Sequence, residues 1–179
     1  MQMLKHLFGL VARGIQDISA YRALARKLRP AITIEVADEA DKDWVNRALA
    51  APGEIRPYVP DPLVTDFVAK HGRTILGYVQ LVHYPPQSGP YVGHWLFSLY
   101  IWPLYRGMGI GQDLCRRVMA QAHQEQAREL FLLVYQDARP ARALYRKLGF
   151  EDTIIPGLAE ILEGDTTGRR RLAMRKVLP

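Results

Sequence analysis

The sequence has little cysteine and lacks a long apolar stretch. Cys115 is the single cysteine of 179 residues, so the chain cannot form an internal disulfide framework or a cysteine-based zinc site. No uninterrupted apolar run approaches the roughly 20 residues needed to cross a bilayer. The remaining composition is ordinary for a globular protein and sufficient for one domain with a sizeable core. We expect a protein without a metal, working in the reducing cytoplasm.

Basic charge is concentrated in the first thirty residues. This segment carries a net charge of +5, whereas the whole chain carries +6. Its apolar residues recur at helical spacing, which predicts a basic amphipathic helix over residues 2–29, ended by Pro30. We therefore divide the chain into this N-terminal helix (1–30) and a nearly neutral domain (31–179).

The predicted N-terminal helix has several roles open to it. It can pack on its own domain or on a second subunit of a homodimer, or lie on an anionic membrane surface. Nucleic acid is disfavoured as a partner, because aromatic and basic residues do not interleave.

Extended and helical patterns alternate between residues 31 and 179. Asp38 is the expected N-cap of the first helix of this domain, and prolines make residues 51–62 a loop. The interleaving indicates an α/β or α+β sheet domain. The predicted strands are 32–36, 64–70, 74–83, 95–101, 130–135 and 172–177. The first predicted helix begins after Asp38 and ends at about residue 49, and two more span about 109–126 and 139–148.

The strongest local motif joins the apolar strand 95–101 to the helix that follows it. Unsatisfied N–H groups and the positive dipole end at a helix N-terminus attract anions, and glycines let the backbone come close to one. The turn therefore predicts a pyrophosphate site. A Walker loop or a Rossmann fingerprint does not fit, because Gln112 stands where each needs another residue. A purely structural turn is the plain alternative. The motif reads Arg106-Gly107-Met108-Gly109-Ile110-Gly111.

These residues resemble the GNAT superfamily of N-acetyltransferases. The family carries Arg/Gln-x-x-Gly-x-Gly/Ala at this turn, and Arg106, Gly109 and Gly111 match it. Residues 141–150 are similar to its second hallmark, a helix with a tyrosine that ends in Leu-Gly-Phe. The family often places an asparagine seven residues before the tyrosine, where this chain has Ala138. The resemblance implies a mixed, mostly antiparallel sheet of about six to seven strands flanked by helices.

The resemblance also implies a reaction and a set of site residues. An acetyl group would pass from acetyl-CoA to a primary amine of a small molecule or peptide, by direct attack. Tyr145 is the expected general acid, which protonates the departing thiolate. The strand before the turn splays from its neighbour in this family, and its N–H groups hold the pantetheine arm. The expected cofactor-binding residues are Leu99, Ile101, Arg106, Met108, Gly109, Gly111 and Gln112.

Several assignments stay open at this point. Glu54, His83, His94 or a water chain could serve as general base. Within the loop 51–62, Glu54 or Asp61 could receive a cationic amine and Arg56 a carboxylate. Cys115 is rejected as a nucleophile, because it lies inside a predicted helix. The candidates for the 3′-phosphate of CoA are Arg116, Arg117 and Arg142.

Two other classes of function compete with an enzyme. One is a CoA-binding regulatory or interaction domain without catalysis, which Ala138 favours and Tyr145 disfavours. The other is a peripheral membrane or scaffold protein that acts through residues 1–30.

Overall fold

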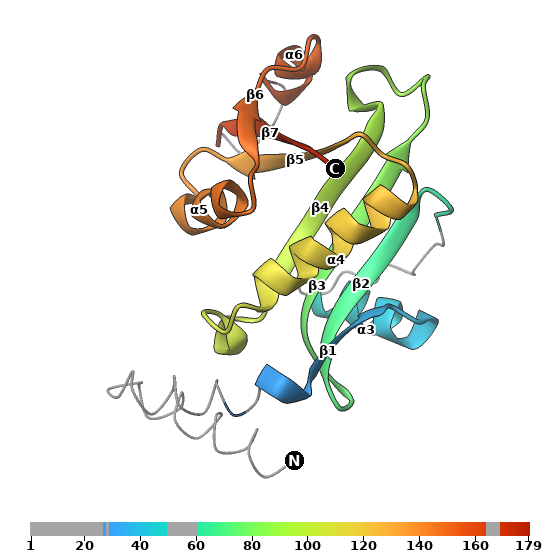
Figure 1. The fold of residues 1–179 in the computed structure, drawn as a ribbon, viewed down its shortest axis with the longest axis vertical. Helices are drawn as coiled ribbons and strands as arrows, with labels where there is room; N and C mark the ends of the chain where they lie inside the picture. The colour runs from blue at the N-terminus through green and yellow to red at the C-terminus, as the bar shows by residue number, and fades with distance from the viewer. Residues whose placement is uncertain (1–26, 28, 50–60, 164–168) are drawn as a thin grey trace.

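The architecture is a single mixed sheet with helices on both faces (Figure 1). The computed structural model describes residues 27, 29–49, 61–163 and 169–179. Within these residues the sheet has seven strands in the order β1-β2-β3-β4-β5-β7-β6, and only the β4–β5 pair is parallel. The expected mixed, mostly antiparallel sheet is thus confirmed. The strands are β1 (Ile32–Val36), β2 (Val64–His71), β3 (Thr74–Tyr84), β4 (Gly93–Ile101), β5 (Glu129–Tyr135), β6 (Glu151–Thr153) and β7 (Arg171–Val177).

The described residues also form four α-helices and three short 3-10 helices, all of which connect strands except η1, which precedes β1. The α-helices are α3 (Glu39–Leu49), α4 (Ile110–Gln124), α5 (Arg139–Lys147) and α6 (Leu158–Glu163). The 3-10 helices are η1 (Arg29–Ala31), η2 (Gly89–Tyr91) and η3 (Pro103–Tyr105). None of the described helices is both long and apolar enough to span a membrane.

Local chemistry explains where these helices begin and end. At the start of α3 the Asp41 N–H donates to Asp38 Oδ1 at 2.8 Å, and the Asp38 N–H donates to Asp41 Oδ2 at 3.2 Å. This reciprocal cap satisfies two N–H groups that the helix leaves unpaired. Gly109 before α4 and Gly149 after α5 have φ of +83° and +85°, the left-handed conformation that glycine adopts without strain.

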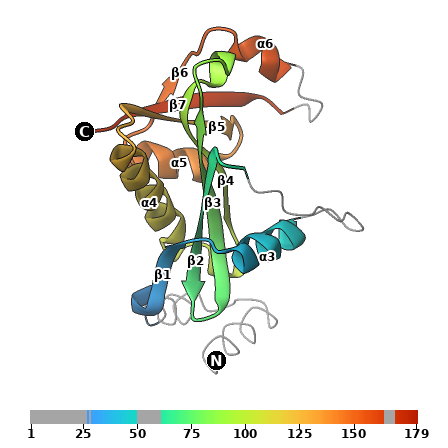
Figure 2. The same ribbon diagram turned by 90° about the vertical axis from the view of Figure 1, so that its right-hand side faces the viewer.

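Alternating side chains divide the core between the two faces of the sheet. Phe67 of β2 belongs to the main cluster, which includes residues of α4 and α5. The next residue, Val68, points the other way and belongs to a cluster with Val45 of α3. Trp95 and Leu158 of α6 belong to a third cluster. The helices α4 and α5 therefore lie on one face of the sheet, and α3 and α6 on the other (Figures 1 and 2).

Three features differ from the sequence prediction or lie beyond it. Strand β6 and helix α6 were not predicted; β6 has three residues with exposed charges, and its pairing with β7 stabilises it. The β2–β3 turn is shorter than expected, because His71 pairs with Thr74. Most of the predicted helix 2–29 lies outside the described residues, and Arg29 is in a 3-10 turn.

Candidate active site

The glycine-rich turn forms the N-terminus of α4. Gly107 and Gly109 both have positive φ, +77° and +83°. The Gly109 carbonyl accepts hydrogen bonds from the N–H groups of Gln112 and Asp113 at 3.0 and 3.1 Å, which starts the helix. The N–H groups just before these have no intrahelical acceptor, since an α-helix leaves its first donors unpaired. This end of α4 therefore has the geometry of an anion site.

Gly111 lies in the first turn of α4, against α5 and the end of β4. A Cβ at this position would lie 3.4 Å from Leu144 Cδ2 of α5 and 3.7 Å from Ile101 Cγ1 of β4. These are ordinary van der Waals distances, so packing alone does not require glycine here.

Strands β4 and β5 separate next to this turn. Their parallel pairing runs from His94 and Leu130 to Leu96 and Leu132, and no later pair joins them although both strands are fully described. The register of β4 against β3 is also irregular near Ser98, which has a φ of 54°. A kink of this kind re-aims the strand. The expected splay is present, and Leu99 and Ile101 lie on the part of β4 that has left β5.

The backbone of Ile101 faces the splay. The Trp102 N–H donates to the Leu76 carbonyl of β3 at 3.1 Å. Because successive residues of a strand direct their polar groups to opposite sides, the N–H and carbonyl of Ile101 point away from β3. Arg106 Nε donates to this carbonyl at 3.0 Å, so Arg106 helps fix the end of β4.

Tyr145 lies on α5 within the main core. Its side chain is 6% exposed and packs edge-on against Phe150, with ring centroids 5.9 Å apart. Burial, together with the neighbouring Cys115, raises the pKa of the Tyr145 hydroxyl above its ordinary value. The phenol is therefore protonated at neutral pH, the state that a proton donor needs. The same burial also fits an aromatic core residue.

Cys115 is a buried core residue of α4. Its side chain has no exposed surface, and burial raises the pKa of the thiol to about 12. A thiolate nucleophile is therefore disfavoured at this position, as the sequence indicated.

The start of α5 lacks a polar side chain at the position of the family asparagine. Ala138 stands before the helix and makes no side-chain cap. Its neighbour Asp137 accepts a hydrogen bond from Arg169 Nη2 at 2.7 Å, and this bond lowers the pKa of the Asp137 carboxyl. Asp137 is thus paired within the protein.

The three arginines suggested for the 3′-phosphate all have partners in the protein. Arg142 donates to Asp152 at 3.2 Å, and the Arg117 guanidinium lies 4.7 Å from the Phe67 ring centroid. Arg116 is 3.8 Å from Asp113 and is 59% exposed. Of these three, Arg116 is the best placed to reach a ligand at the turn, because it lies on the first turns of α4.

His83 and His94 lie at the far end of the sheet from the glycine turn. Seven residues of extended β4 separate His94 from Ile101, a distance of roughly 23 Å at about 3.3 Å per residue. This distance argues against either histidine as general base. His94 Nε2 instead lies 3.1 Å from Glu125 Oε2.

The same two histidines and Glu125 form a group with metal-ligand chemistry. Their ligand atoms lie within 4.8 Å of one another. However, the imidazole rings are stacked, with centroids 4.0 Å apart and planes 13° from parallel. In-plane lone pairs of stacked rings run side by side and do not converge on one ion. The expectation of a protein without a metal stays a prediction.

Two polar features near the sheet were not found from the sequence. Asp66 is 2% exposed, and its Oδ1 accepts hydrogen bonds from Tyr78 at 2.6 Å and Gln80 at 3.1 Å. The signal in the sequence was a single acid within an apolar strand. The other feature is Arg29, which contacts the Met108 carbonyl in the glycine turn, 79 residues away in sequence.

The suggested substrate residues Glu54 and Arg56 lie outside the described residues. Asp61 caps a turn, because its Oδ1 accepts a hydrogen bond from the Leu63 N–H at 2.9 Å.

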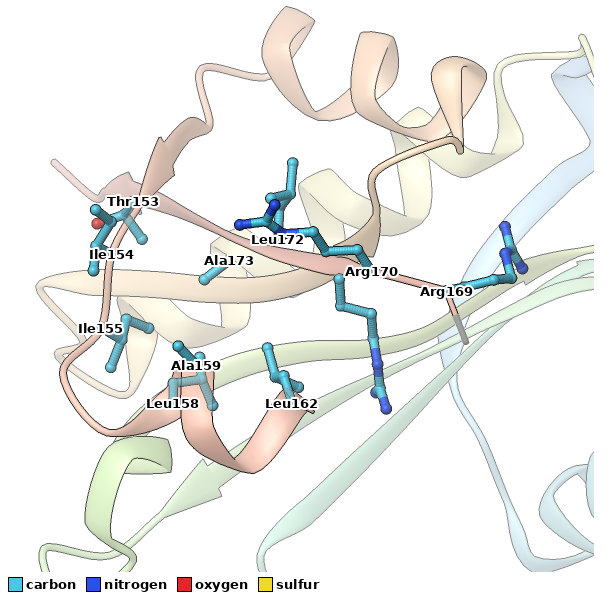
Figure 3. Close-up of a pocket in the computed structure, with 11 residues that line it drawn as sticks. Thr153, Ile154, Ile155, Leu158, Ala159, Leu162, Arg169, Arg170, Leu172 and Ala173 are labelled. Carbon is cyan, nitrogen blue, oxygen red and sulfur yellow. The ribbon is translucent and has the colours of Figure 1, made fainter. Parts of the chain in front are cut away.

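A pocket of about 560 Å³ lies between β6, α6 and β7 (Figure 3). Its inner side is apolar and includes Ile155, Leu158 and Leu162. Arg170 and neighbouring arginines lie at one edge. Strand β7 pairs with β5, one of the two strands that border the splay.

The comparisons with known proteins agree with this geometry. A family model described as "Acetyltransferase (GNAT) family" matches residues 31–150. An uncharacterized N-acetyltransferase of Mycobacterium tuberculosis is 29% identical over 136 residues, which cover 75% of this chain and 83% of that protein.

Solved structures share the fold at lower identity. A nourseothricin acetyltransferase has a TM-score of 0.63 at 18% identity, covering 83% of this chain and 99% of that one. An acetyltransferase of Bacillus subtilis in complex with CoA has a TM-score of 0.57 at 16% identity, covering 83% of this chain and 99% of that one. Since the family model spans more than half of the sequence, the chain belongs to the GNAT family of acetyltransferases.

Proposed function

We propose that this chain transfers an acetyl group from acetyl-CoA to a primary amine of a small molecule or peptide. The observation that carries the proposal is the position of the glycine turn. It caps α4 directly beside the place where β4 leaves β5. An anion site and an exposed strand edge thus adjoin, as binding of a diphosphate with an extended pantetheine arm requires.

The residues present fit this cosubstrate. The space beside Gly107 is open, and the N–H groups of Met108, Gly109 and Gly111 would bind the diphosphate. The N–H of Gln112, also expected from the sequence to bind it, donates to the Gly109 carbonyl at 3.0 Å. The N–H of Ile101 faces the splay and, with that of Leu99, would bind the pantetheine amides. Arg106 would hold the end of β4 in place through the Ile101 carbonyl.

The chemistry supplied by acetyl-CoA is an activated thioester. The amine nitrogen forms a bond to the acetyl carbon, the carbon–sulfur bond breaks, and the sulfur leaves with its electron pair. A backbone N–H at the splay would stabilise negative charge on the carbonyl oxygen. The hydroxyl of Tyr145 would give its proton to the departing sulfur, and the amine loses one proton to solvent or a base.

The acceptor would approach from the face that α3 and α6 cover. The opposite face is filled by α4 and α5, which pack on the main core. The pocket between β6, α6 and β7 lies on the approach side and offers an apolar wall to the acceptor.

Calorimetric titration of acetyl-CoA into the full chain tests the cofactor site. The Gln112→Glu variant adds one negative charge at the first turn of α4, and we expect it to weaken binding about tenfold. The same substitution should slightly stabilise the helix, because acids near an N-terminus favour its dipole. A loss of affinity without a loss of stability thus separates repulsion of the ligand from unfolding.

The matched control is Gln124→Glu, at the other end of α4. This change introduces the same charge on the same helix and should leave acetyl-CoA binding unchanged. Equal effects of both substitutions, or no binding by the native chain, would refute a cofactor site at the turn.

A second candidate is a CoA-binding domain without catalysis. Ala138 favours it, because the position lacks the side chain that often contacts the cofactor in this family. A panel of amines, assayed by release of the CoA thiol, separates the two. Acetylation of any amine above the rate without protein excludes the non-catalytic alternative.

A further inference from the structure

The glycine turn receives a cation from a distant part of the chain. Arg29, in η1 before β1, donates through Nη1 to the carbonyl of Met108. Its Nη2 lies 3.0 Å from Asp113 Oδ2 and 3.3 Å from Asp113 Oδ1. The guanidinium also occupies the space that a Cβ at Gly109 would need. Arg29 thus contacts one residue just before α4, Met108, and one residue in its first turn, Asp113.

Asp113 makes this contact electrostatically significant. Its carboxylate lies in the first turn of α4, where it favours the helix dipole. A diphosphate bound at the same N-terminus would be repelled by that carboxylate. Within the described residues Asp113 pairs with Arg29 at 3.0 Å and with Arg116 at 3.8 Å, so Arg29 is the nearer cation. Arg29 therefore compensates an acid that opposes the anion.

The guanidinium also has capacity for a ligand. Its two terminal nitrogens each contact the turn, and the side chain remains 49% exposed. A guanidinium carries five N–H donors in a planar fork that suits phosphate oxygens. The remaining donors can bind a phosphate while those to Met108 and Asp113 are kept.

We propose that Arg29, at the end of the basic N-terminal segment, is a diphosphate-binding residue of the acetyl-CoA site. This inference rests on the proposed function and extends the cofactor site to η1. Arg29 contacts the diphosphate directly and neutralises Asp113.

The test is calorimetric titration of acetyl-CoA into the full chain and its variants. We expect Arg29→Ala to weaken binding about tenfold and Arg29→Lys to weaken it less, because lysine keeps the charge but not the fork. In an Asp113→Asn background the loss from Arg29→Ala should shrink to about threefold, since the acid that needed compensation is gone. The control is Arg175→Ala. Arg175 is an exposed arginine of β7 that pairs with Glu129 of β5.

Two further readouts separate a phosphate contact from a structural role. The loss from Arg29→Ala should diminish at high salt, because screening weakens interactions of exposed charges. It should persist with 3′-dephospho-CoA, which retains the diphosphate. A loss of affinity that does not depend on salt, together with an altered thermal midpoint, would mean that Arg29 only supports the turn. A loss of affinity that disappears with 3′-dephospho-CoA would place Arg29 at the 3′-phosphate. Either result overturns the proposal.

The native chain distinguishes failure of this inference from failure of the proposed function. If the native chain does not bind acetyl-CoA, the proposed function fails first. If it binds and Arg29→Ala binds within twofold, only the role of Arg29 is refuted. Tighter binding by Arg29→Ala would show that the guanidinium competes with the anion, and would also overturn the inference.

Discussion

The two halves of β4 differ in almost every physical respect. In the first half, Trp95 and Leu96 are 0% and 2% exposed and pair with strands on both sides. In the second half, beyond Ser98, the strand is kinked, half-buried and unpaired on its β5 side among the described residues. One continuous strand thus joins a fully paired core to an open edge.

The fold assigns stability to one half of β4 and the proposed binding role to the other. The paired half fixes the position of β4 through the core and both ladders. The free half can then expose backbone N–H groups without losing its place. Ligand-binding segments generally belong to the less stable parts of a protein, and the proposed binding segment of this chain is held by the more stable part of the same strand.

The largest expected effect is on the free energy of unfolding, and it is seen by comparing alanine variants of two leucines in β4. Leu96→Ala should destabilise the protein by about 3–4 kcal/mol, because it leaves a cavity under α4. Leu99→Ala, in the half-buried part, should cost only about 1–2 kcal/mol. Urea unfolding of both variants gives the two values. Equal costs would mean that the splay is as tightly packed as the paired half.

A second prediction concerns the rate of the proposed acetyl transfer at the splay. Tyr145→Phe should lower kcat about 10- to 100-fold and leave KM nearly unchanged, because in the proposed reaction the hydroxyl would protonate the departing sulfur. Steady-state thiol release with an accepted amine measures both constants. Tyr84→Phe makes the same change at the far end of β3 and should have little effect. An unchanged kcat for Tyr145→Phe would reduce Tyr145 to a core aromatic.

The smallest expected effect lies at the other end of β4. Burial and the charge of His83 lower the pKa of His94 from its ordinary value of 6.5, and together they outweigh the attraction of Glu125. A lowered folded-state pKa contributes stability that is present above 6.5 and is lost as the pH falls through the folded value. The neutral imidazole is therefore the stabilising form.

Thermal unfolding between pH 7.5 and 5 checks this sign. The native chain should lose stability more steeply with acid than His94→Gln, while acetyl-CoA binding by this variant stays native-like. His123→Gln, an exposed histidine near the end of α4, is the control. A steeper acid loss in His94→Gln would reverse the sign and indicate that the pair with Glu125 dominates.

Local signals were enough for most of the fold. The left-handed glycines at 109 and 149 and the cap at Asp38 are short-range features, and each is where the sequence predicts it. Strand β6 and helix α6 are different, because β6 depends on pairing with β7, twenty residues further along the chain. A three-residue charged strand has no pattern of its own to detect.

The candidate site was only partly accessible to sequence reasoning. The turn was visible because its three glycines lie at alternate positions within five residues, and the splay came from the family resemblance. The roles of Arg29 and Asp66 were not predicted, because their partners are distant in sequence and no local spacing links them. His83 and His94 were candidate bases by residue type alone, and only the sheet places them at the wrong end of β4.

The most direct test is a backbone amide NMR titration of the full chain with acetyl-CoA. We expect the N–H signals of Ile101, Gly111 and Gln112 to shift on binding, while those of His94 and Leu96 stay in place. Shifts confined to the paired half of β4, or no shifts at the turn from a protein that binds the ligand, would contradict it.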